Sequence, residues 1–197
     1  MHEIVKLSEL DDNQLNQAVD VFIEGFYNTL QSVSKDKDIL HKLFKNAFDG
    51  NMTYACLQDG CAVGFLGLAD FQKRPIKLSE EIFAEVLGAS GKRLYRAVSL
   101  SMEKIIVNNP NEIWIDYIAT NPSCRSTGIG QKLIEYICAN LDYGYIRLMV
   151  LSKNPRAIAF YEKTGFKKEN EKLKLLVFLQ GFGKEVTMRR NIDDKQL

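Results

Sequence analysis

The sequence predicts one α/β domain built on a mixed β-sheet. Three observations support this fold class. Apolar strand-like runs alternate with helical patterns, most clearly after residue 109. An Asp-Gly pair between two β-rich segments is typical of an antiparallel hairpin. No linker or internal repeat divides the 197 residues, a length that fits one domain. We therefore expect a single domain over residues 1–197.

Composition and charge exclude several classes of protein. Hydrophobic residues make up 46% of the chain and charged residues 26%, a balance typical of globular proteins and not of disordered ones. The formal net charge of +1 argues against a nucleic-acid partner, which needs a strongly basic surface. Four scattered cysteines and two isolated histidines provide neither a disulfide framework nor a metal-ligand spacing, so we expect no metal.

The chain also shows no feature of a membrane or secreted protein. No apolar run approaches the roughly 18 residues that are needed to cross a bilayer. The first residues have no basic start leading into an apolar core, so no signal peptide is visible. We expect a cytoplasmic protein without membrane contact.

In the first half of the chain, two helical patterns precede a hairpin. Apolar residues at intervals of three and four predict an amphipathic helix over 14–31 and a second helix over 36–48. Two strand-like runs then flank Asp59-Gly60 and predict a hairpin. Its strands are expected at 52–57 and 62–70.

Residues 71–111 interrupt the strand pattern and predict a helical insert between strands. Ser79 precedes two acidic residues, a typical helix start. Two glycines then separate two helices, which are expected near 80–87 and 92–107.

The second half alternates strands and helices. Asn121-Pro122 ends an apolar strand, because proline removes a backbone donor. After the next strand, Asn154 caps a helix that Gly165 ends. The expected elements are strands at 113–120 and 146–151, helices at 128–141 and 154–165, and closing strands at 172–179 and 184–190 around the turn 180–183.

The stretch Arg125-Ser126-Thr127-Gly128-Ile129-Gly130 joins the strand at 113–120 to the next helix. Its glycines let the backbone turn tightly and expose consecutive N–H groups at a helix N-terminus, a site suited to a pyrophosphate. A capped helix start with incidental glycines explains the pattern about as well. A dinucleotide-binding fingerprint needs a third glycine where Leu133 stands, so the Rossmann interpretation fails.

Two motifs resemble those of a known family. Arg125-x-x-Gly128-x-Gly130 resembles the acetyl-coenzyme A (acetyl-CoA) motif of the GNAT N-acetyltransferase superfamily. Asn154-x-x-Ala157-x-x-x-Tyr161-x-x-x-Gly165-Phe166 is similar to the second motif of that family. The resemblance is close over 113–166 and implies the GNAT fold, a central mixed, partly splayed β-sheet flanked by helices. The strand at 113–120 is then expected to diverge from the strand at 146–151 and open a V-shaped cleft.

The resemblance also implies which residues contact acetyl-CoA. The pantetheine arm is expected to lie along one strand as an added strand, and the pyrophosphate on the glycine loop. The implied contacts are Ile118, Ala119 and Thr120 for pantetheine, and Ser126, Thr127, Gly128, Ile129, Gly130 and Gln131 for the pyrophosphate. Arg125 is either an ionic neighbour of the phosphates or a solvated loop charge. Asn154 caps its helix and, by resemblance, also faces the cofactor.

Tyr161 is the candidate general acid. It lies two helical turns after Asn154 and faces the same side of the helix. Its phenol, with a pKa near ~10 in water, would protonate the thiolate of departing coenzyme A. The alternative is a core tyrosine that packs with Phe160 and Phe166.

The sequence leaves two candidates for the general base, Asp116 and Glu24. Asp116 is the only charged residue of the strand at 113–120, and it is a base or substrate anchor, a buried structural acid, or an exposed side chain. Family members often keep an acid two residues earlier, where this chain has Trp114. Glu24 is an alternative amine-binding acid, or part of a solvated helix face.

The resemblance implies an acetyltransferase in which a primary amine attacks acetyl-CoA directly. No Cys or Ser stands in a nucleophile–His arrangement, so no covalent intermediate is expected. The alternatives are a non-catalytic acyl-CoA-binding module and a transferase of a bulkier acyl group. The expected partners are acetyl-CoA and a small-molecule or peptide amine, and a homodimer is left open. The acceptor is expected to meet residues 14–48, 71–111 and the loop at 181–183.

Overall fold

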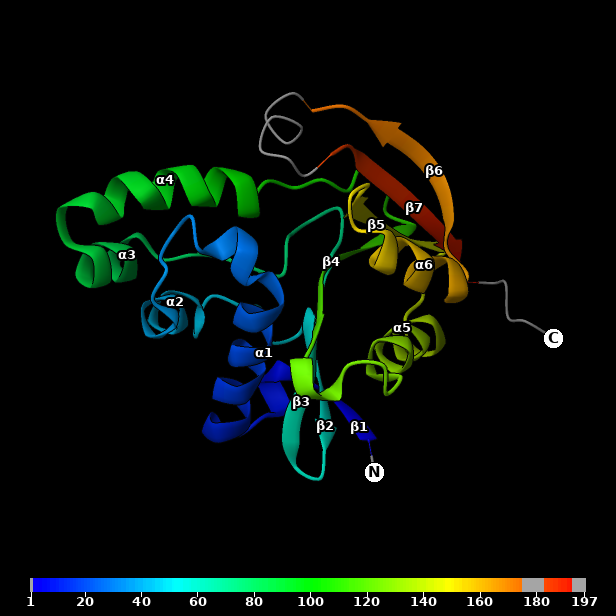
Figure 1. Cartoon of the computed structure of the whole chain (residues 1–197), viewed down its shortest axis with the longest axis horizontal. Coiled ribbons are helices and arrows are strands. Elements are labelled where there is room, and N and C mark those ends of the chain that lie inside the picture. Colours follow the sequence, from blue (N-terminus) through cyan, green and yellow to red (C-terminus); the bar gives the residue numbers. More distant parts are fainter. Residues whose placement is uncertain (1, 175–182, 193–197) are drawn as a thin grey trace.

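The computed structural model of the chain describes residues 2–174 and 183–192. In this part of the chain, a seven-stranded sheet runs in the order β1-β2-β3-β4-β5-β7-β6 (Figure 1). The strands are β1 (His2–Lys6), β2 (Thr53–Gln58), β3 (Cys61–Ala69), β4 (Glu112–Thr120), β5 (Tyr145–Leu151), β6 (Lys167–Lys172) and β7 (Glu185–Asn191). β4 and β5 run parallel and the other neighbours antiparallel, so the predicted mixed sheet is confirmed.

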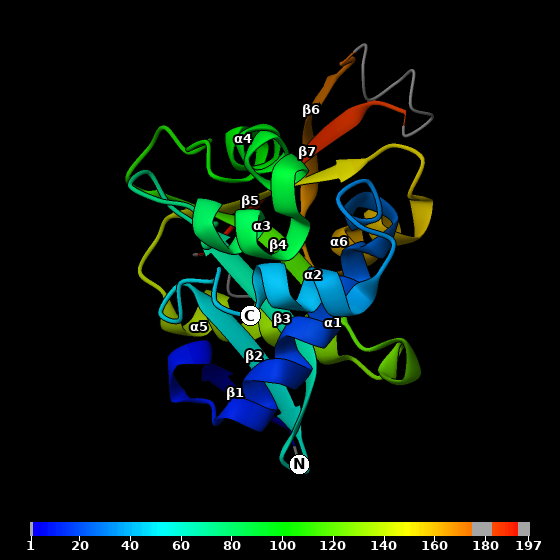
Figure 2. The ribbon, with the colours of Figure 1, turned by 90° about the vertical axis from the view of Figure 1, so that its left-hand side faces the viewer.

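Helices cover both faces of this sheet (Figure 1; Figure 2). In the described ranges they are α1 (Asp12–Leu30), α2 (Lys37–Phe44), α3 (Glu80–Leu87), α4 (Gly91–Met102), α5 (Ile129–Asn140) and α6 (Pro155–Lys163). The first four pack on one face and the last two on the other. Each face has its own hydrophobic core, a first core under α1–α4 and a second core under α5 and α6. Successive side chains of β3 point to opposite faces of the sheet, so Phe65 belongs to the first core and Leu66 to the second. Within residues 2–174 and 183–192, no helical segment combines the length and the apolar character that a membrane span requires.

Local sequence signals explain many of the element boundaries. Asp11 caps α1, because its carboxylate accepts a hydrogen bond from the Gln14 N–H at 2.8 Å and the Gln14 side chain bonds back. Asp59 and Gly60 both have positive φ, 52° and 82°, as a type I′ turn requires, so the predicted hairpin is confirmed. The insert holds two helices, with Ser79 as the cap of α3.

Two helices end earlier than the sequence predicts, because the residues after them make tertiary contacts. α2 ends at Phe44 and not at residue 48, since the Ala47 carbonyl accepts a hydrogen bond from Lys77 at 2.7 Å. α4 ends at residue 102 and not at 107. The Glu103 carboxylate next to it accepts a hydrogen bond from the Leu78 N–H at 2.8 Å.

Two strands also differ from the prediction. The first closing strand is β6, which lies before the predicted 172–179. All of its residues are exposed and polar, a composition suited to an edge strand that gives no apolar signal in the sequence. Most of the predicted strand and turn, residues 175–182, lies outside the described residues. β1 was not predicted, because five residues are too few to show a clear period.

The sheet divides between β4 and β5. β4 pairs with β5 only through residues 112–115, whereas it pairs with β3 as far as Thr120. Within residues 2–174 and 183–192, the edge of β4 that faces β5 is therefore unpaired beyond Ile115, as is that of β5 beyond Leu148. The divergence of these two strands that the sequence led us to expect is thus present.

Candidate functional site

The unpaired edge of β4 carries all three predicted pantetheine contacts. Ile118, Ala119 and Thr120 pair with β3 on one side and have no partner strand among the described residues on the β5 side. α1 approaches this strand closely, because a Cβ atom on Gly25 would lie 2.4 Å from the Ala119 Cβ. Free backbone donors and acceptors on such an edge can bind an extended ligand as an added strand.

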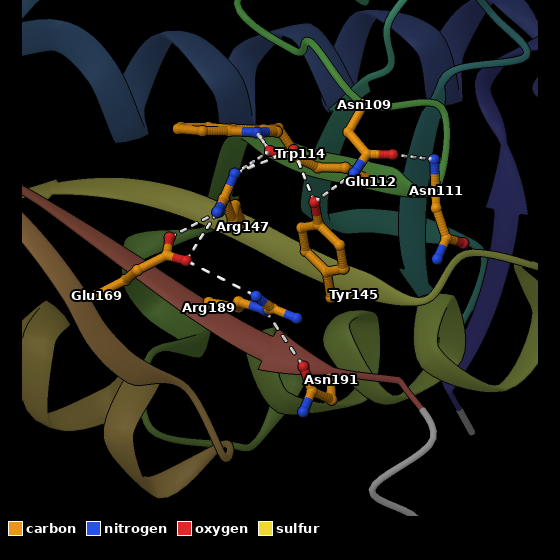
Figure 3. A network of polar contacts seen from close by, with 9 residues as sticks. All are labelled: Asn109, Asn111, Glu112, Trp114, Tyr145, Arg147, Glu169, Arg189 and Asn191. Atoms are coloured by element: carbon orange, nitrogen blue, oxygen red, sulfur yellow. Dashed lines mark hydrogen bonds and ion pairs between the residues drawn. The ribbon is translucent and has the colours of Figure 1, made fainter.

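A network of polar contacts joins β4 and β5 at the end where the two strands are still paired, the closed end of the cleft (Figure 3). Glu112 on β4 accepts hydrogen bonds from Arg147 on β5 at 3.0 and 3.1 Å, and Arg147 also pairs with Glu169 on β6 at 2.7 Å. The Trp114 indole N–H donates to the same Glu112 carboxylate. Trp114, at the position where family members often keep an acid, thus completes a structural contact. The network joins β4, β5 and β6 at the paired end of β4, before β4 and β5 diverge.

The glycine loop has a backbone conformation that suits an anion. Gly128 is the residue before α5 and has φ 85° and ψ 3°, in the left-handed region that glycine adopts without strain. Ser126 also has a positive φ of 66°. No side chain of the described residues caps α5, so its first-turn N–H groups remain available. The predicted helix N-terminus with open donors is therefore present.

The other loop residues have distinct local roles. Ile129 is buried against Gly64, where a Cβ would lie 2.7 Å from the Ile129 Cγ2. A Cβ on Gly130 would lie 3.0 Å from the Phe160 ring, so this glycine allows α5 and α6 to pack closely. The missing side chain of Gly130 therefore serves packing, and its backbone N–H stays a predicted donor to the pyrophosphate.

The side chains around these glycines are mostly bound within the loop or exposed. The Thr127 hydroxyl donates to the Cys124 carbonyl at 2.6 Å, and Gln131 donates to Glu135 at 2.6 Å. Arg125 is exposed, which leaves both interpretations of it open.

Arg156 is a second cation at this loop that the sequence analysis did not select. Its guanidinium donates to the Ser126 hydroxyl at 3.4 Å from the first turn of α6. The signal for it was its place two residues after Asn154, inside the second motif. Guanidinium groups match phosphate oxygens in geometry and charge, so Arg156 is a further candidate phosphate contact.

Asn154 and Tyr161 both belong to α6. The Asn154 side chain accepts a hydrogen bond from the Ala157 N–H at 3.1 Å, which confirms its role as the helix cap. Tyr161 is 9% exposed and packs against Phe160 and Phe166, with ring centroids 5.3 and 5.8 Å apart. Burial raises the pKa of its phenol to about 12. Tyr161 is therefore part of the second core, and this contact is compatible with either predicted role.

Asp116 is buried in an ion pair. Arg74 donates to its two oxygens at 2.5 Å from Nε and 2.6 Å from Nη2. Burial raises the pKa of the Asp116 carboxyl, and the Arg74 guanidinium opposes this rise. The interpretation of Asp116 as an exposed side chain is wrong, since the side chain is 6% exposed. The bidentate contact is typical of a structural acid.

Glu24 lies at the surface of α1 and forms an ion pair with Lys37. It also lines a cavity of about 570 Å³ between α1, the start of β3 and the loop after β4, together with Asp20 and Asn121. Within the part of the chain described, no group of three or more His, Cys, Asp or Glu side chains is arranged to hold a metal ion.

Comparison with known proteins identifies the family. The model of the acetyltransferase (GNAT) family matches residues 16–166. A comparison with curated proteins finds no match. One similar solved structure is a histone acetyltransferase HPA2 and related acetyltransferase from Corynebacterium glutamicum, with a TM-score of 0.59 and 18% identity over 96% of this chain and 95% of that chain.

A second is the ribosomal-protein-S18-alanine N-acetyltransferase from Escherichia coli, with a TM-score of 0.56 and 16% identity over 100% of this chain and 99% of that chain. At these identities the structures establish the fold only. The family model covers most of the chain, and members of this family take the acetyl group from acetyl-CoA. The chain therefore belongs to the GNAT family of acetyltransferases.

Proposed function

We propose that the protein is an N-acetyltransferase in which a primary amine attacks the thioester carbonyl of acetyl-CoA directly. The observation that carries this proposal is the combination of the unpaired β4 edge with the left-handed Gly128 before an uncapped helix. The first provides hydrogen-bond partners for an extended chain, and the second provides donors for a pyrophosphate.

Three groups of residues are proposed to hold acetyl-CoA. Backbone groups of Ile118, Ala119 and Thr120 bind the pantetheine arm. Backbone N–H groups from Ser126 to Gln131 bind the pyrophosphate, with Arg156 as a neighbouring cation. Backbone N–H groups on the unpaired edge of β4 stabilise the negative charge that develops on the carbonyl oxygen during attack.

Tyr161 is proposed to stabilise the departing thiolate. A free thiol has a pKa of about 8.5, whereas burial raises the pKa of the Tyr161 phenol to about 12. Complete proton transfer from this phenol to a solvent-like thiolate is therefore uphill. Donation of a hydrogen bond to the sulfur as its charge develops avoids that cost, because Tyr161 keeps its proton and the thiolate takes up a proton from water after it leaves.

The proton of the attacking amine is proposed to leave through water. Asp116 is bound by Arg74 and Glu24 by Lys37, so neither carboxylate is a free acceptor. The same two contacts favour a second candidate function, a non-catalytic acyl-CoA-binding module. Both candidates require the cleft to bind acetyl-CoA, and they differ in turnover.

One experiment tests the proposal. Purified protein is incubated with acetyl-CoA and a panel of polyamines, aminoglycosides, amino acids and peptides with free N-termini, and the free thiol of coenzyme A is measured. The proposal predicts thiol release that depends on one acceptor class. Binding of acetyl-CoA without acceptor-dependent release from any of these classes would favour the binding module, and no binding of acetyl-CoA would overturn both functions.

A further inference from the structure

The point where β4 leaves β5 coincides with an irregularity in β4. On the β3 side, Gly67 pairs with Tyr117 and Leu68 with Ile115, so Asp116 is an extra residue that bulges from the ladder. On the β5 side, Ile115 is the last paired residue. Asp116 therefore begins the stretch of backbone whose free groups face the cleft.

All three guanidinium nitrogens of Arg74 are hydrogen-bonded, and two of them bind the bulge. Nε and Nη2 donate to Asp116, and Nη1 donates to the Lys104 carbonyl at 2.9 Å. The Arg74 side chain is 9% exposed. One guanidinium thus joins β4 to the segment before α3 and to the segment after α4.

The backbone around Arg74 is fixed as well. The carbonyl of Pro75 accepts a hydrogen bond from the Asp49 N–H at 2.8 Å, and Ile76 forms a β-bridge with Phe48. Pro75 packs over Gly67 beside Tyr117, since a Cβ on Gly67 would lie 3.1 Å from both side chains. Arg74 therefore extends from a rigid support to the bulge.

We infer that Arg74 is a positioning residue for acyl transfer, which acts through Asp116 to fix the direction of the β4 backbone N–H groups that bind the acetyl carbonyl. This inference rests on the proposed function. Asp116 contributes to this positioning through its shape and charge, as the carboxylate that Arg74 binds. A rotation of the bulge would turn these donors away from the carbonyl without affecting the glycine loop, which lies beyond the end of β4.

The test is spectroscopic and needs no acceptor. Acetyl-CoA labelled with ¹³C at the acetyl carbonyl is bound to the wild type and to Arg74→Lys, which keeps the charge but loses the two-point contact. Hydrogen bonds to a carbonyl polarise it and move its ¹³C resonance. Lys73→Gln is the matched control, because it removes the adjacent ion pair of Lys73 with Asp49 and leaves β4 unchanged.

We expect the resonance to move on binding to the wild type and to Lys73→Gln, and to return toward its free position in Arg74→Lys. The dissociation constant of acetyl-CoA should change less than about threefold. With an acceptor from the panel above, kcat of Arg74→Lys should fall about 10–100-fold, the effect of slight misplacement of reacting groups.

A wild-type resonance in Arg74→Lys would overturn the inference, whatever its melting temperature. Loss of acetyl-CoA binding in a folded Arg74→Lys would also overturn it, and assign Arg74 to the fold of the cleft. If the wild type binds acetyl-CoA but the resonance does not move, the inference is also overturned. If the wild type does not bind acetyl-CoA, the proposed function is refuted instead. If Arg74→Lys does not fold, Asp116→Asn, which keeps the shape of the carboxyl, takes its place under the same criteria.

Discussion

Replacement of Tyr161 by Phe separates the two interpretations of this residue. Tyr161→Phe removes one hydroxyl from the second core, and no hydrogen bond of that hydroxyl is found among the described residues. The loss in unfolding free energy should therefore stay below about 1 kcal/mol, the typical net value of a hydrogen bond. If the hydroxyl assists the departing thiolate, kcat should fall about 10²–10⁴-fold.

A matched control makes the same change at another tyrosine, where the opposite outcome is expected. The Tyr145 hydroxyl donates to Glu112 at 3.2 Å and accepts from Asn109 at 3.0 Å, in the network at the closed end of the cleft. Tyr145→Phe should therefore cost roughly 1 kcal/mol and lower the melting temperature by about 2–4 °C, with little change in kcat.

The assay measures thermal unfolding and steady-state release of coenzyme A on the same preparations, with saturating acetyl-CoA and the acceptor found by the panel. A Tyr161→Phe protein with the kcat of the wild type would remove Tyr161 from the mechanism. A fall in melting temperature without a fall in kcat would assign it to the core alone.

The remaining predictions use simpler readouts. Acetyl-CoA at ~100 times its dissociation constant should stabilise the fold by about 2.7 kcal/mol, visible as a rise in melting temperature. Gly128→Val should fold but lose this response, because its φ of 85° is strained for valine and its side chain would cover the amides; a normal response would contradict the phosphate-loop assignment. Gly25→Val should destabilise the protein by about 1–3 kcal/mol through its clash with Ala119, and an unchanged melting temperature would refute that contact. Burial raises the pKa of Tyr161 to about 12, so its phenol stays protonated as pH rises to about 10; an alkaline loss of kcat near pH 9 that Tyr161→Phe abolishes would refute this.

The sequence predicts the segment 113–166 best, because its signals are local. Asn154 caps its helix within three residues, and Gly128 is required by the conformation of its own backbone. Such residues reveal their role in a short window of sequence. The fold class and the glycine loop could be predicted for that reason.

Contacts between distant segments could not be predicted in this way. Arg74 and Asp116 are 42 residues apart, and nothing near either one indicates the other. The same holds for Gly130 and Phe160, which meet only because two helices pack. β6 escaped prediction because pairing with β7, and not apolar periodicity, defines it. The sequence could thus name Asp116 as a candidate but could not show what binds it.

The parting of β4 from β5 also has a consequence for handling the protein. Two strands in the middle of the sheet each present a row of main-chain groups that have no partner in the part of the chain that the structure describes, as strands at the rim of a sheet do. Rims of this kind recruit extended segments of other chains, which promotes aggregation. A bound pantetheine arm would occupy this gap and act as a missing strand. Purification in the presence of coenzyme A should therefore keep the protein dispersed at higher concentration, and amide hydrogens along residues 116–120 should then exchange more slowly with solvent.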